Sequence, residues 1–340
     1  MEKKTYSVKK AFGPYLPNIN IPEGWTVTGY EQKTDNVPEA DPHYIYDLGL
    51  FRDLLNWWEL YWQAKVTDGL LLFGPPGCGK TAGLTQLAAL LNIPLYEKTA
   101  YGRMRFEELV ARTQILSGSS FVQYGQLSKA MGADDMPGIL LLNEADHAQE
   151  GVLTGMNEVL QGGPLDVLGQ EVLTPKPGFR VAFTANTGLL GDTSGGNFRG
   201  ARRQNMASVD RFMQVKLTYP DPDTELAILA RKVPDLPEAI AKGFIEVAND
   251  VRAANHGTSA KMDALEVTIS TRGLIRWAYL AVAYKDAEKS GISPIAYALE
   301  RAVLNVASPE TQQAVLKIVS DKFGSDESMS TKGKGKKAAA

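Results

Sequence analysis

The stretch GLLLFGPPGCGKTAGLTQLAALL, residues 69–91, decides the fold. A short apolar run typical of a buried strand leads into a glycine-rich loop, and a helical run follows the loop. The loop, Gly74 to Thr81, fits the pattern G-x-x-x-x-G-K-[ST] in the strand–loop–helix context that gives this pattern its meaning. Its glycines let backbone N–H groups turn toward phosphates, and the helix N-terminus adds positive potential. The stretch therefore predicts a phosphate-binding loop in an α/β fold.

This loop predicts a nucleotide site that uses ATP and Mg²⁺. The Lys80 ammonium can reach the β- and γ-phosphates, and the Thr81 hydroxyl can bind Mg²⁺. Cys78 stands at a variable position of the loop, so we expect no catalytic role for it, although alkylation of its thiol should block nucleotide entry. The predicted nucleotide-binding residues are Gly74, Pro75, Pro76, Gly77, Cys78, Gly79, Lys80, Thr81 and Ala82.

An acidic strand follows about 60 residues after Lys80, as ILLLNEADHA at residues 139–148. Glu144 ends this strand, where a carboxylate can orient and deprotonate the attacking water. The preceding position usually carries Asp in nucleotide-hydrolysing proteins, and here it is Asn143. Asn143 keeps an oxygen for Mg²⁺ or its water but lacks the negative charge. We therefore predict Glu144 as a catalytic residue, and Thr81 and Asn143 as the metal-binding residues.

The missing charge leaves two hypotheses. A unit charge about 4 Å from the ion is worth roughly 4 kcal/mol at an effective dielectric constant near 20. Because the phosphates and Thr81 still hold the ion, the deficit should appear mainly as weaker Mg²⁺ affinity. Since Glu144 is retained, the favoured interpretation is a working but slow ATPase. The alternative is a nucleotide-gated structural or adaptor ring with little turnover.

The chain as a whole reads as two folded parts. From Gly69 to about Pro220, five apolar runs alternate with helical stretches, which predicts a parallel sheet with helices on both faces. These runs are GLLLFG, IPLYEKTA, GILLLNEA, FRVAFTAN and FMQVKLTYP. A helix over 48–65 precedes them, and its aromatic stripe should be core or subunit contact. The predicted domains are an irregular N-terminal arm over 1–40, an αβα nucleotide-binding domain over 41–220, a smaller all-α domain over 221–323 and a disordered basic tail over 324–340.

Composition narrows the classes of function. The formal net charge of −3 argues against a general nucleic-acid binder, which usually carries a basic domain. The single cysteine excludes an intramolecular disulfide and a thiolate metal site, and the three histidines are scattered. The N-terminal MEKKTYSVKK has no apolar targeting segment, and no apolar run approaches the roughly 20 residues of a membrane span. We therefore expect a cytoplasmic protein with no membrane partner.

Three polar residues further along the chain complete the predicted catalytic set. Asn186 ends the run RVAFTAN, which brings its amide near the γ-phosphate or the attacking water. Arg211 in VDRF stands just before the next strand, and Arg272 lies in the first turn of a helix that Ser270 can cap. Taken alone, each arginine fits a surface salt bridge. Their order after a phosphate-binding loop favours catalytic roles.

These motifs together resemble the AAA+ ATPases, in particular the MoxR-like branch and, within it, the CobS-type cobaltochelatase ATPase subunits and their relatives. The resemblance spans about residues 36–285, and residues 179–195 are its most branch-specific part. The stretches that carry it are VPEADPHYIYD, GPPGCGKT, LLLNEAD, LQGGPLDVLGQEV, PKPGFRVAFTANTGLLGDTSG and VDRFMQVKLTYP.

The resemblance implies an αβα core, a helical lid and a homo-oligomeric ring, usually a hexamer, with ATP between subunits. By position, Asn186 would be the first sensor, Arg272 the second sensor and Arg211 the arginine finger that completes the neighbour's site. Rival candidates for the finger are Arg199, Arg202 and Arg203. The family also implies a β-hairpin over 161–178 and a loop over 188–204 that face the pore or a partner.

The family further implies a protein client and a partner with a von Willebrand factor A-type domain. Asn143 departs from the family's Asp, which affects turnover. Because no metal-handling residues stand out, a chelatase role would belong to partner subunits. A nucleic-acid translocase remains the third hypothesis because of the three arginines within 199–203.

Overall fold

The computed structural model describes residues 2–17, 19–116, 119–133, 136–192, 198, 200–255, 265–290 and 292–324. The chain forms two compact units, one made of Met1–Pro42 with Tyr46–Thr218 and the other of His43–Ile45 with Tyr219–Ala340. Each unit has its own hydrophobic core. Among the described residues, no helix combines the length and apolarity that a bilayer crossing requires.

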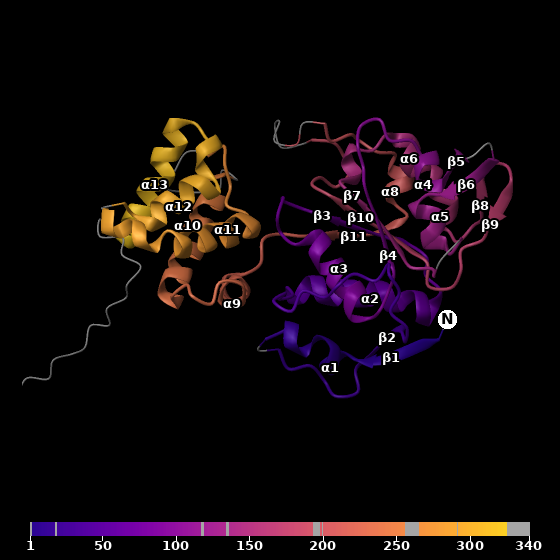
Figure 1. Cartoon of the computed structure of the whole chain (residues 1–340), viewed down its shortest axis with the longest axis horizontal. Helices are drawn as coiled ribbons and strands as arrows, with labels where there is room; N and C mark the ends of the chain where they lie inside the picture. The colour runs from indigo at the N-terminus through magenta and orange to yellow at the C-terminus, as the bar shows by residue number, and fades with distance from the viewer. Residues whose placement is uncertain are drawn as a thin grey trace, which may run out of the picture. The chain divides into compact units, whose positions relative to one another are not determined.

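A five-stranded parallel sheet organises the first unit (Figure 1). Its strands, in spatial order, are β11 (Phe212–Lys216), β3 (Gly69–Phe73), β10 (Arg180–Ala185), β7 (Ile139–Asn143) and β4 (Leu95–Thr99). All residues of β7 and β10 are buried, as expected for central strands covered on both faces. The sheet confirms the α/β prediction, and its strands coincide with the five apolar runs.

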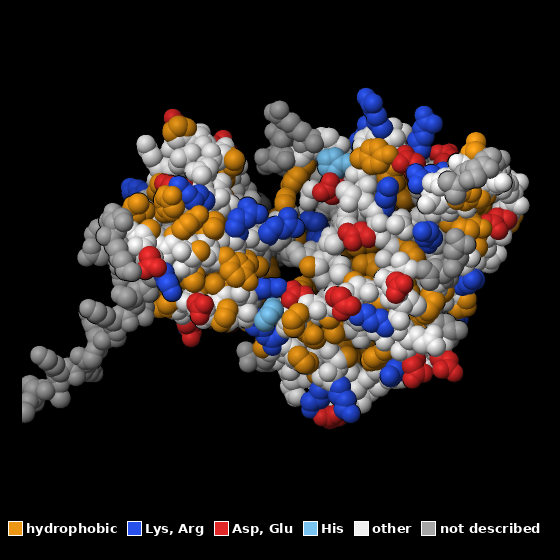
Figure 2. Space-filling view, viewed as in Figure 1, with side chains coloured by type: hydrophobic (Ala, Val, Ile, Leu, Met, Phe, Trp, Pro, Cys, Tyr) orange, Lys and Arg blue, Asp and Glu red, His pale blue; other side chains and the backbone are white. Residues whose placement is uncertain are grey.

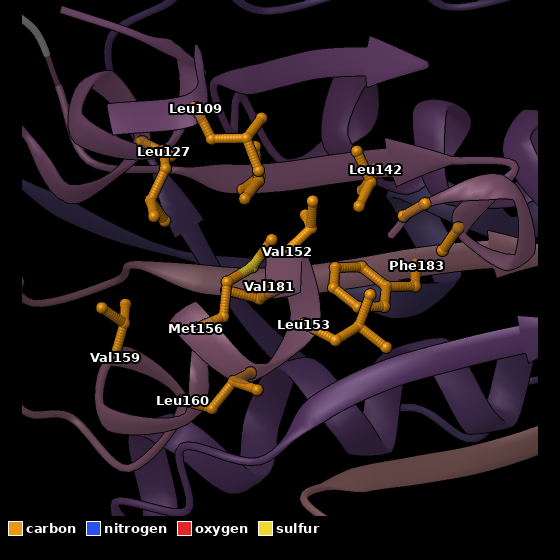
Figure 3. Close-up of a cluster of buried hydrophobic side chains, with 14 of the residues drawn as sticks. Leu109, Leu127, Leu142, Val152, Leu153, Met156, Val159, Leu160, Val181 and Phe183 are labelled. Carbon is orange, nitrogen blue, oxygen red and sulfur yellow. The ribbon is translucent and has the colours of Figure 1, made fainter. Parts of the chain in front are cut away.

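Helices cover the sheet on both sides, with α2 and α3 on one side and α6 and α8 on the other (Figure 1). On the second side, apolar side chains of the α6–α7 segment gather over Val181 and Phe183 of β10 (Figure 3). The predicted αβα arrangement is therefore present. The helices of this unit are α1 (Val8–Phe12), α2 (Leu48–Ala64), α3 (Lys80–Leu90), α4 (Glu107–Val110), α5 (Gln126–Met131), α6 (Glu150–Gly155), α7 (Asn157–Leu160) and α8 (Met206–Val209), with 3-10 turns at Gly13–Tyr15 and Ala145–His147.

The prediction of an irregular arm over residues 1–40 is wrong. Strands β1 (Lys3–Ser7) and β2 (Thr26–Tyr30) pair in antiparallel fashion, and α1 follows β1 directly. Phe12 of α1 is fully buried, and the indole Nε1 of Trp58 on α2 donates a hydrogen bond of 2.6 Å to the Thr28 carbonyl. The proline and glycine residues that suggested irregularity lie mostly in the connection between the strands. The aromatic stripe of α2 is core, because it covers this hairpin.

Two further hairpins project from the first unit. Strands β8 (Leu165–Val167) and β9 (Glu171–Leu173) confirm the hairpin predicted over 161–178. A second hairpin, β5 (Ala111–Leu116) with β6 (Ser119–Tyr124), was not predicted. The Tyr124 hydroxyl donates a hydrogen bond to the Glu171 carboxylate and so joins the two hairpins, which lie side by side (Figure 1).

All the regular secondary structure among the described residues of the second unit is helical, as predicted. Its core includes Phe244 and Trp277, whose rings stack with centroids 3.7 Å apart. Residues 325–340 of the predicted tail lie outside the described residues. The helices are α9 (Pro222–Lys232), α10 (Glu238–Asn255), α11 (Thr271–Ala283), α12 (Pro294–Ala302) and α13 (Pro309–Phe323), with 3-10 turns at Lys285–Ser290 and Leu304–Val306.

Candidate nucleotide-binding site

The glycine-rich loop connects β3 to α3 and has a backbone that only glycine adopts easily. Gly74, Gly77 and Gly79 all have positive φ angles, of 150°, 72° and 101°. A Cβ atom on Gly74 would lie 2.2 Å from the Leu217 carbonyl oxygen, so no side chain fits there. The strand–loop–helix context predicted from sequence is confirmed, and Gly79 caps α3 at the N-terminus.

Backbone carbonyls of the loop hold the side chain of Lys80 in place. Its ammonium donates to the carbonyls of Gly74 at 2.7 Å and Pro75 at 2.9 Å. It also donates to the Oδ1 atom of Asn186 at 3.2 Å, across 106 residues of sequence. Parallel strands β3 and β10 end at the same edge of the sheet, which explains why these two predicted residues meet.

Asn143, at the end of β7, joins the two central strands to the loop. Its Oδ1 atom accepts hydrogen bonds from the hydroxyls of Thr81 at 2.7 Å and Thr184 at 2.8 Å. Its Nδ2 atom donates to the carboxylate of Glu97 on β4. The two predicted metal-binding residues, Thr81 and Asn143, are therefore in direct contact. Thr184 and Glu97 complete this cluster, and neither was predicted.

Glu144 follows Asn143 in a left-handed backbone conformation, with φ 54° and ψ 41°. Such a conformation is uncommon outside glycine and is often found where function fixes the backbone. Its N–H donates to the Thr184 hydroxyl at 3.4 Å, and its side chain is exposed at the carboxyl edge of the sheet. A carboxylate so placed can reach a water molecule at this edge.

Asp146 is a site residue that the sequence reasoning missed. Its side chain is fully buried, and Oδ2 accepts from the backbone N–H groups of Asn186 at 2.9 Å and Thr187 at 3.1 Å. Its Oδ1 atom is buried without a hydrogen-bond partner among the described residues. Asp146 thus fixes the backbone that carries the Asn186 amide. A second acidic residue two positions after Glu144, shortly after the apolar run of β7, was the available signal.

Arg211 lies at the other end of the strands. Phe212 pairs with Gly69 at the start of β3, whereas the loop begins at Gly74, beyond the end of β3. Arg211 lies one residue before Phe212, so at about 3.3 Å per residue it is about 20 Å from Gly74 along the strand direction. Its guanidinium donates to the Ala207 carbonyl. The structure therefore separates Arg211 from the glycine-rich loop of its own chain.

The other predicted arginines are dispersed. Arg202 is exposed and donates to the Gly102 carbonyl at 3.3 Å, and Arg203 is also exposed. Arg199 lies outside the described residues. In the second unit, Arg272 is exposed in the first turn of α11. The Ser270 hydroxyl accepts from the Gly273 N–H at 3.0 Å, which confirms the predicted cap.

In comparisons with known proteins, each unit matches a family model. Residues 69–197 match the family model of an AAA domain (dynein-related subfamily), and residues 225–322 match that of a CbbQ/NirQ/NorQ C-terminal domain. The aerobic cobaltochelatase subunit CobS of Sinorhizobium sp is 29% identical over 293 residues, covering 83% of this chain and 82% of that protein.

Two further similarities extend the comparison. The protein NorQ of Paracoccus denitrificans is 27% identical over 249 residues, covering 68% of this chain and 86% of that protein. Among solved structures, the chain is similar to the RuvB Holliday junction branch migration motor of Thermotoga maritima, with a TM-score of 0.47 and 12% identity, covering 86% of this chain and 74% of that one.

Proposed function

This chain is an AAA ATPase of the CobS, NorQ and CbbQ type, and from that premise we propose that it hydrolyses ATP as a ring that remodels or activates a client protein. One observation carries the proposal. Lys80, Thr81, Asn143 and Asn186, which are distant in sequence, converge at the carboxyl edge of the sheet beside a glycine loop. This is the edge where open α/β sheets bind their ligands.

The loop and its neighbouring residues fit a nucleoside triphosphate with Mg²⁺. The positive-φ glycines and the N-terminus of α3 offer N–H groups to phosphate oxygens. The oxygen atoms Thr81 Oγ1 and Asn143 Oδ1 are 2.7 Å apart, and Mg²⁺ prefers oxygen ligands of this kind. We propose that Thr81 and Asn143 hold this ion, which when bound would neutralise charge on the phosphate oxygens.

The remaining residues of this edge supply positioning and proton transfer. Glu144 accepts the proton of the attacking water, and the Asn186 amide orients that water or the γ-phosphate. The Lys80 ammonium, now bonded to loop carbonyls and Asn186, neutralises the β- and γ-phosphates. Asp146 keeps the Asn186 backbone in place.

A second subunit is needed to complete this site. Arg211 is about 20 Å from its own loop along the strands, so in our proposal it serves the site of a neighbouring subunit as the finger. A finger in other phosphoryl-transfer systems is worth about 10³–10⁵ in rate, so turnover should require assembly. By its resemblance to the family, Arg272 serves as the second sensor. We propose a homo-oligomeric ring, with the hexamer usual for the family.

The client and the partner are proposed from the paired hairpins and the relatives. CobS is by name a subunit of a larger enzyme, which favours work with other proteins. The two hairpins expose Ile115, Phe121 and Val172 at 78%, 42% and 70%. Exposed apolar side chains of this kind mark interaction surfaces. We propose that this surface meets the client or a partner with a von Willebrand factor A-type domain.

A nucleotide-gated scaffold is the second candidate, because Asn143 lacks the usual charge. Nucleic-acid translocation is less favoured. On the face of the first unit shown in Figure 2, acidic and basic side chains are interspersed and form no basic track among the described residues. A salt-dependent DNA-binding assay distinguishes this third option.

Steady-state ATP hydrolysis and ring assembly, measured on wild type and Glu144→Gln, test the proposal. We expect wild-type turnover per chain to rise with protein concentration. Glu144→Gln should bind ATP and assemble but lose at least about 100-fold in turnover. If wild type assembles with ATP yet is as inert as Glu144→Gln, the chain is a scaffold and the enzyme proposal is wrong.

A further inference from the structure

We propose that Glu97 is a positioning residue for the metal end of the nucleotide site, where its carboxylate fixes the amide of Asn143 and restores the negative charge that Asn143 lacks. The inference rests on the function proposed above. It assigns a role to a residue outside the glycine-rich loop, the acidic strand and the sensors. It also explains how a site with Asn143 can still hold Mg²⁺.

The topology of the sheet brings Glu97 to this place. Strand β4 is the edge strand next to β7, and Thr99 pairs with Asn143 in their parallel register. Side chains two residues apart on a strand share a face, so Glu97 lies diagonal to Asn143 on one face of the sheet. Its carboxylate accepts a hydrogen bond from Nδ2 of Asn143, 46 residues away in sequence.

This hydrogen bond fixes which end of the amide faces the nucleotide. A carboxylate only accepts hydrogen bonds, so it selects the Nδ2 end of Asn143. The Oδ1 end must then point to the hydroxyls of Thr81 and Thr184, as observed. The opposite orientation would direct N–H groups at a cation. Glu97 therefore keeps an oxygen available where Mg²⁺ needs one.

The same contact places the negative charge of Glu97 one hydrogen bond away from position 143, where the usual aspartate would carry its charge. Asn143 is 8% exposed, whereas Glu97 is exposed to solvent. Solvent weakens the field of an exposed carboxylate, so the replacement is partial. Glu97 should thus reduce the Mg²⁺ requirement without matching the effect of an aspartate at position 143.

A nearby acid provides a matched control. Glu108 is also exposed, but its carboxylate accepts from the Tyr101 hydroxyl at 2.6 Å and the Arg105 N–H at 2.9 Å. These bonds hold it away from the Thr81–Asn143 cluster. Glu108→Gln therefore makes the same change in net charge as Glu97→Gln and leaves the Asn143 amide untouched.

The test measures binding of a fluorescent, non-hydrolysable ATP analogue to the full chain as Mg²⁺ is titrated, so it does not depend on turnover. We expect Glu97→Gln to raise the Mg²⁺ concentration for half-maximal binding about tenfold. Loss of a residue that hydrogen-bonds a metal ligand typically lowers metal affinity by about 10- to 100-fold, and this is the lower end of that range. Glu108→Gln should match wild type. Equal Mg²⁺ requirements in Glu97→Gln and wild type would overturn the role of Glu97 and leave the ATPase proposal standing.

A double-mutant cycle separates this role from a general effect on the fold. In Glu97→Gln/Asn143→Asp, the charge returns to position 143 and the new amide at position 97 can donate to it, so the Mg²⁺ requirement should return to within about threefold of wild type. A double variant as impaired as Glu97→Gln would overturn the inference. Failure of wild type to bind the analogue at any Mg²⁺ concentration would overturn the proposed function itself, and this inference with it.

Discussion

Asn143 makes three side-chain hydrogen bonds, to Thr81, Thr184 and Glu97, and it is almost fully buried. An amide can satisfy these partners because it both donates and accepts, whereas a carboxylate there would face Glu97 without a proton between them. The residue that departs from the family pattern is therefore well accommodated by its surroundings. Asn143 and Glu97 act as one structural unit.

Asn143→Asp should lower the Mg²⁺ concentration for half-maximal ATP turnover, by about threefold to tenfold, because the charge returns next to Thr81. The gain is smaller than the Coulomb energy suggests, since the introduced carboxylate and Glu97 repel each other. Turnover measured against Mg²⁺ at fixed ATP checks this. An unchanged or higher Mg²⁺ requirement would show that the charge at position 143 does not govern metal binding.

Motifs predicted which residues lie together at the candidate site, but not all of their contacts. The positions of Lys80, Thr81, Asn143 and Glu144 at the loop and the strand end followed from local pattern. Glu97 and Asp146 escaped prediction because their roles depend on strand register and on bonds across 46 and 40 residues. Such contacts exist only once β4, β7 and β10 are paired.

The loop between β3 and α3 depends on the close approach of Gly74 to the backbone at Leu217. In Gly74→Ala, a methyl group would meet that carbonyl at 2.2 Å, and the positive φ would be strained. We expect nucleotide affinity to fall at least about tenfold, because the loop must shift. Equilibrium binding of fluorescent ADP measures this.

Gly151→Ala is the control for this change. Gly151 lies in α6 with open space around its Cβ position, so alanine should leave affinity as it is. If Gly74→Ala binds ADP like wild type, the loop is more tolerant than its geometry indicates.

In the second unit, a buried ion pair connects three helices. The Arg252 guanidinium of α10 donates to both carboxylate oxygens of Glu225 on α9, at 2.9 and 2.8 Å, and the Thr271 hydroxyl of α11 donates to the same carboxylate. Thr271 precedes Arg272, so this pair also fixes the start of the helix that carries Arg272.

Arg252→Leu should destabilise the second unit by about 3–5 kcal/mol, because it leaves the Glu225 charge buried without a cation. Urea unfolding followed by circular dichroism measures the loss. Adding Glu225→Gln should recover much of it, and Glu238→Gln, in an exposed pair with Lys242, should unfold like wild type. A double variant as unstable as Arg252→Leu would show that the unpaired charge is not the cause.

Secondary structure was predictable where the hydrophobic pattern was long or strict. The five sheet strands, the helix carrying the aromatic stripe and the hairpin at Leu165–Leu173 followed from pattern and resemblance. The β1–β2 pair did not, because β1 has no fully buried residue and β2 packs against the aromatic side chains of α2. Burial set by a distant element leaves little local signal.

At the level of the whole molecule, the sequence anticipated two units and a boundary near residue 220, and the units divide at Thr218 and Tyr219. Each unit has a hydrophobic core of its own, so the helices and strands of one unit could be predicted without reference to the other. Assembly leaves no comparable local pattern. The proposal of a ring rests on Arg211, which the sheet places away from its own loop.

The most direct measurement of the central claim is ATP turnover by mixed variants. In the proposed ring, Lys80→Ala removes the proposed phosphate contact and Arg211→Ala removes the proposed finger, so each variant alone should be nearly inert. Mixed in equal amounts and reassembled, they should recover about a quarter of wild-type turnover, because a ring of random order juxtaposes an intact loop with an intact finger at that fraction of its interfaces. A mixture as inert as its parents, beside an active wild type, would contradict a site completed by the neighbouring subunit.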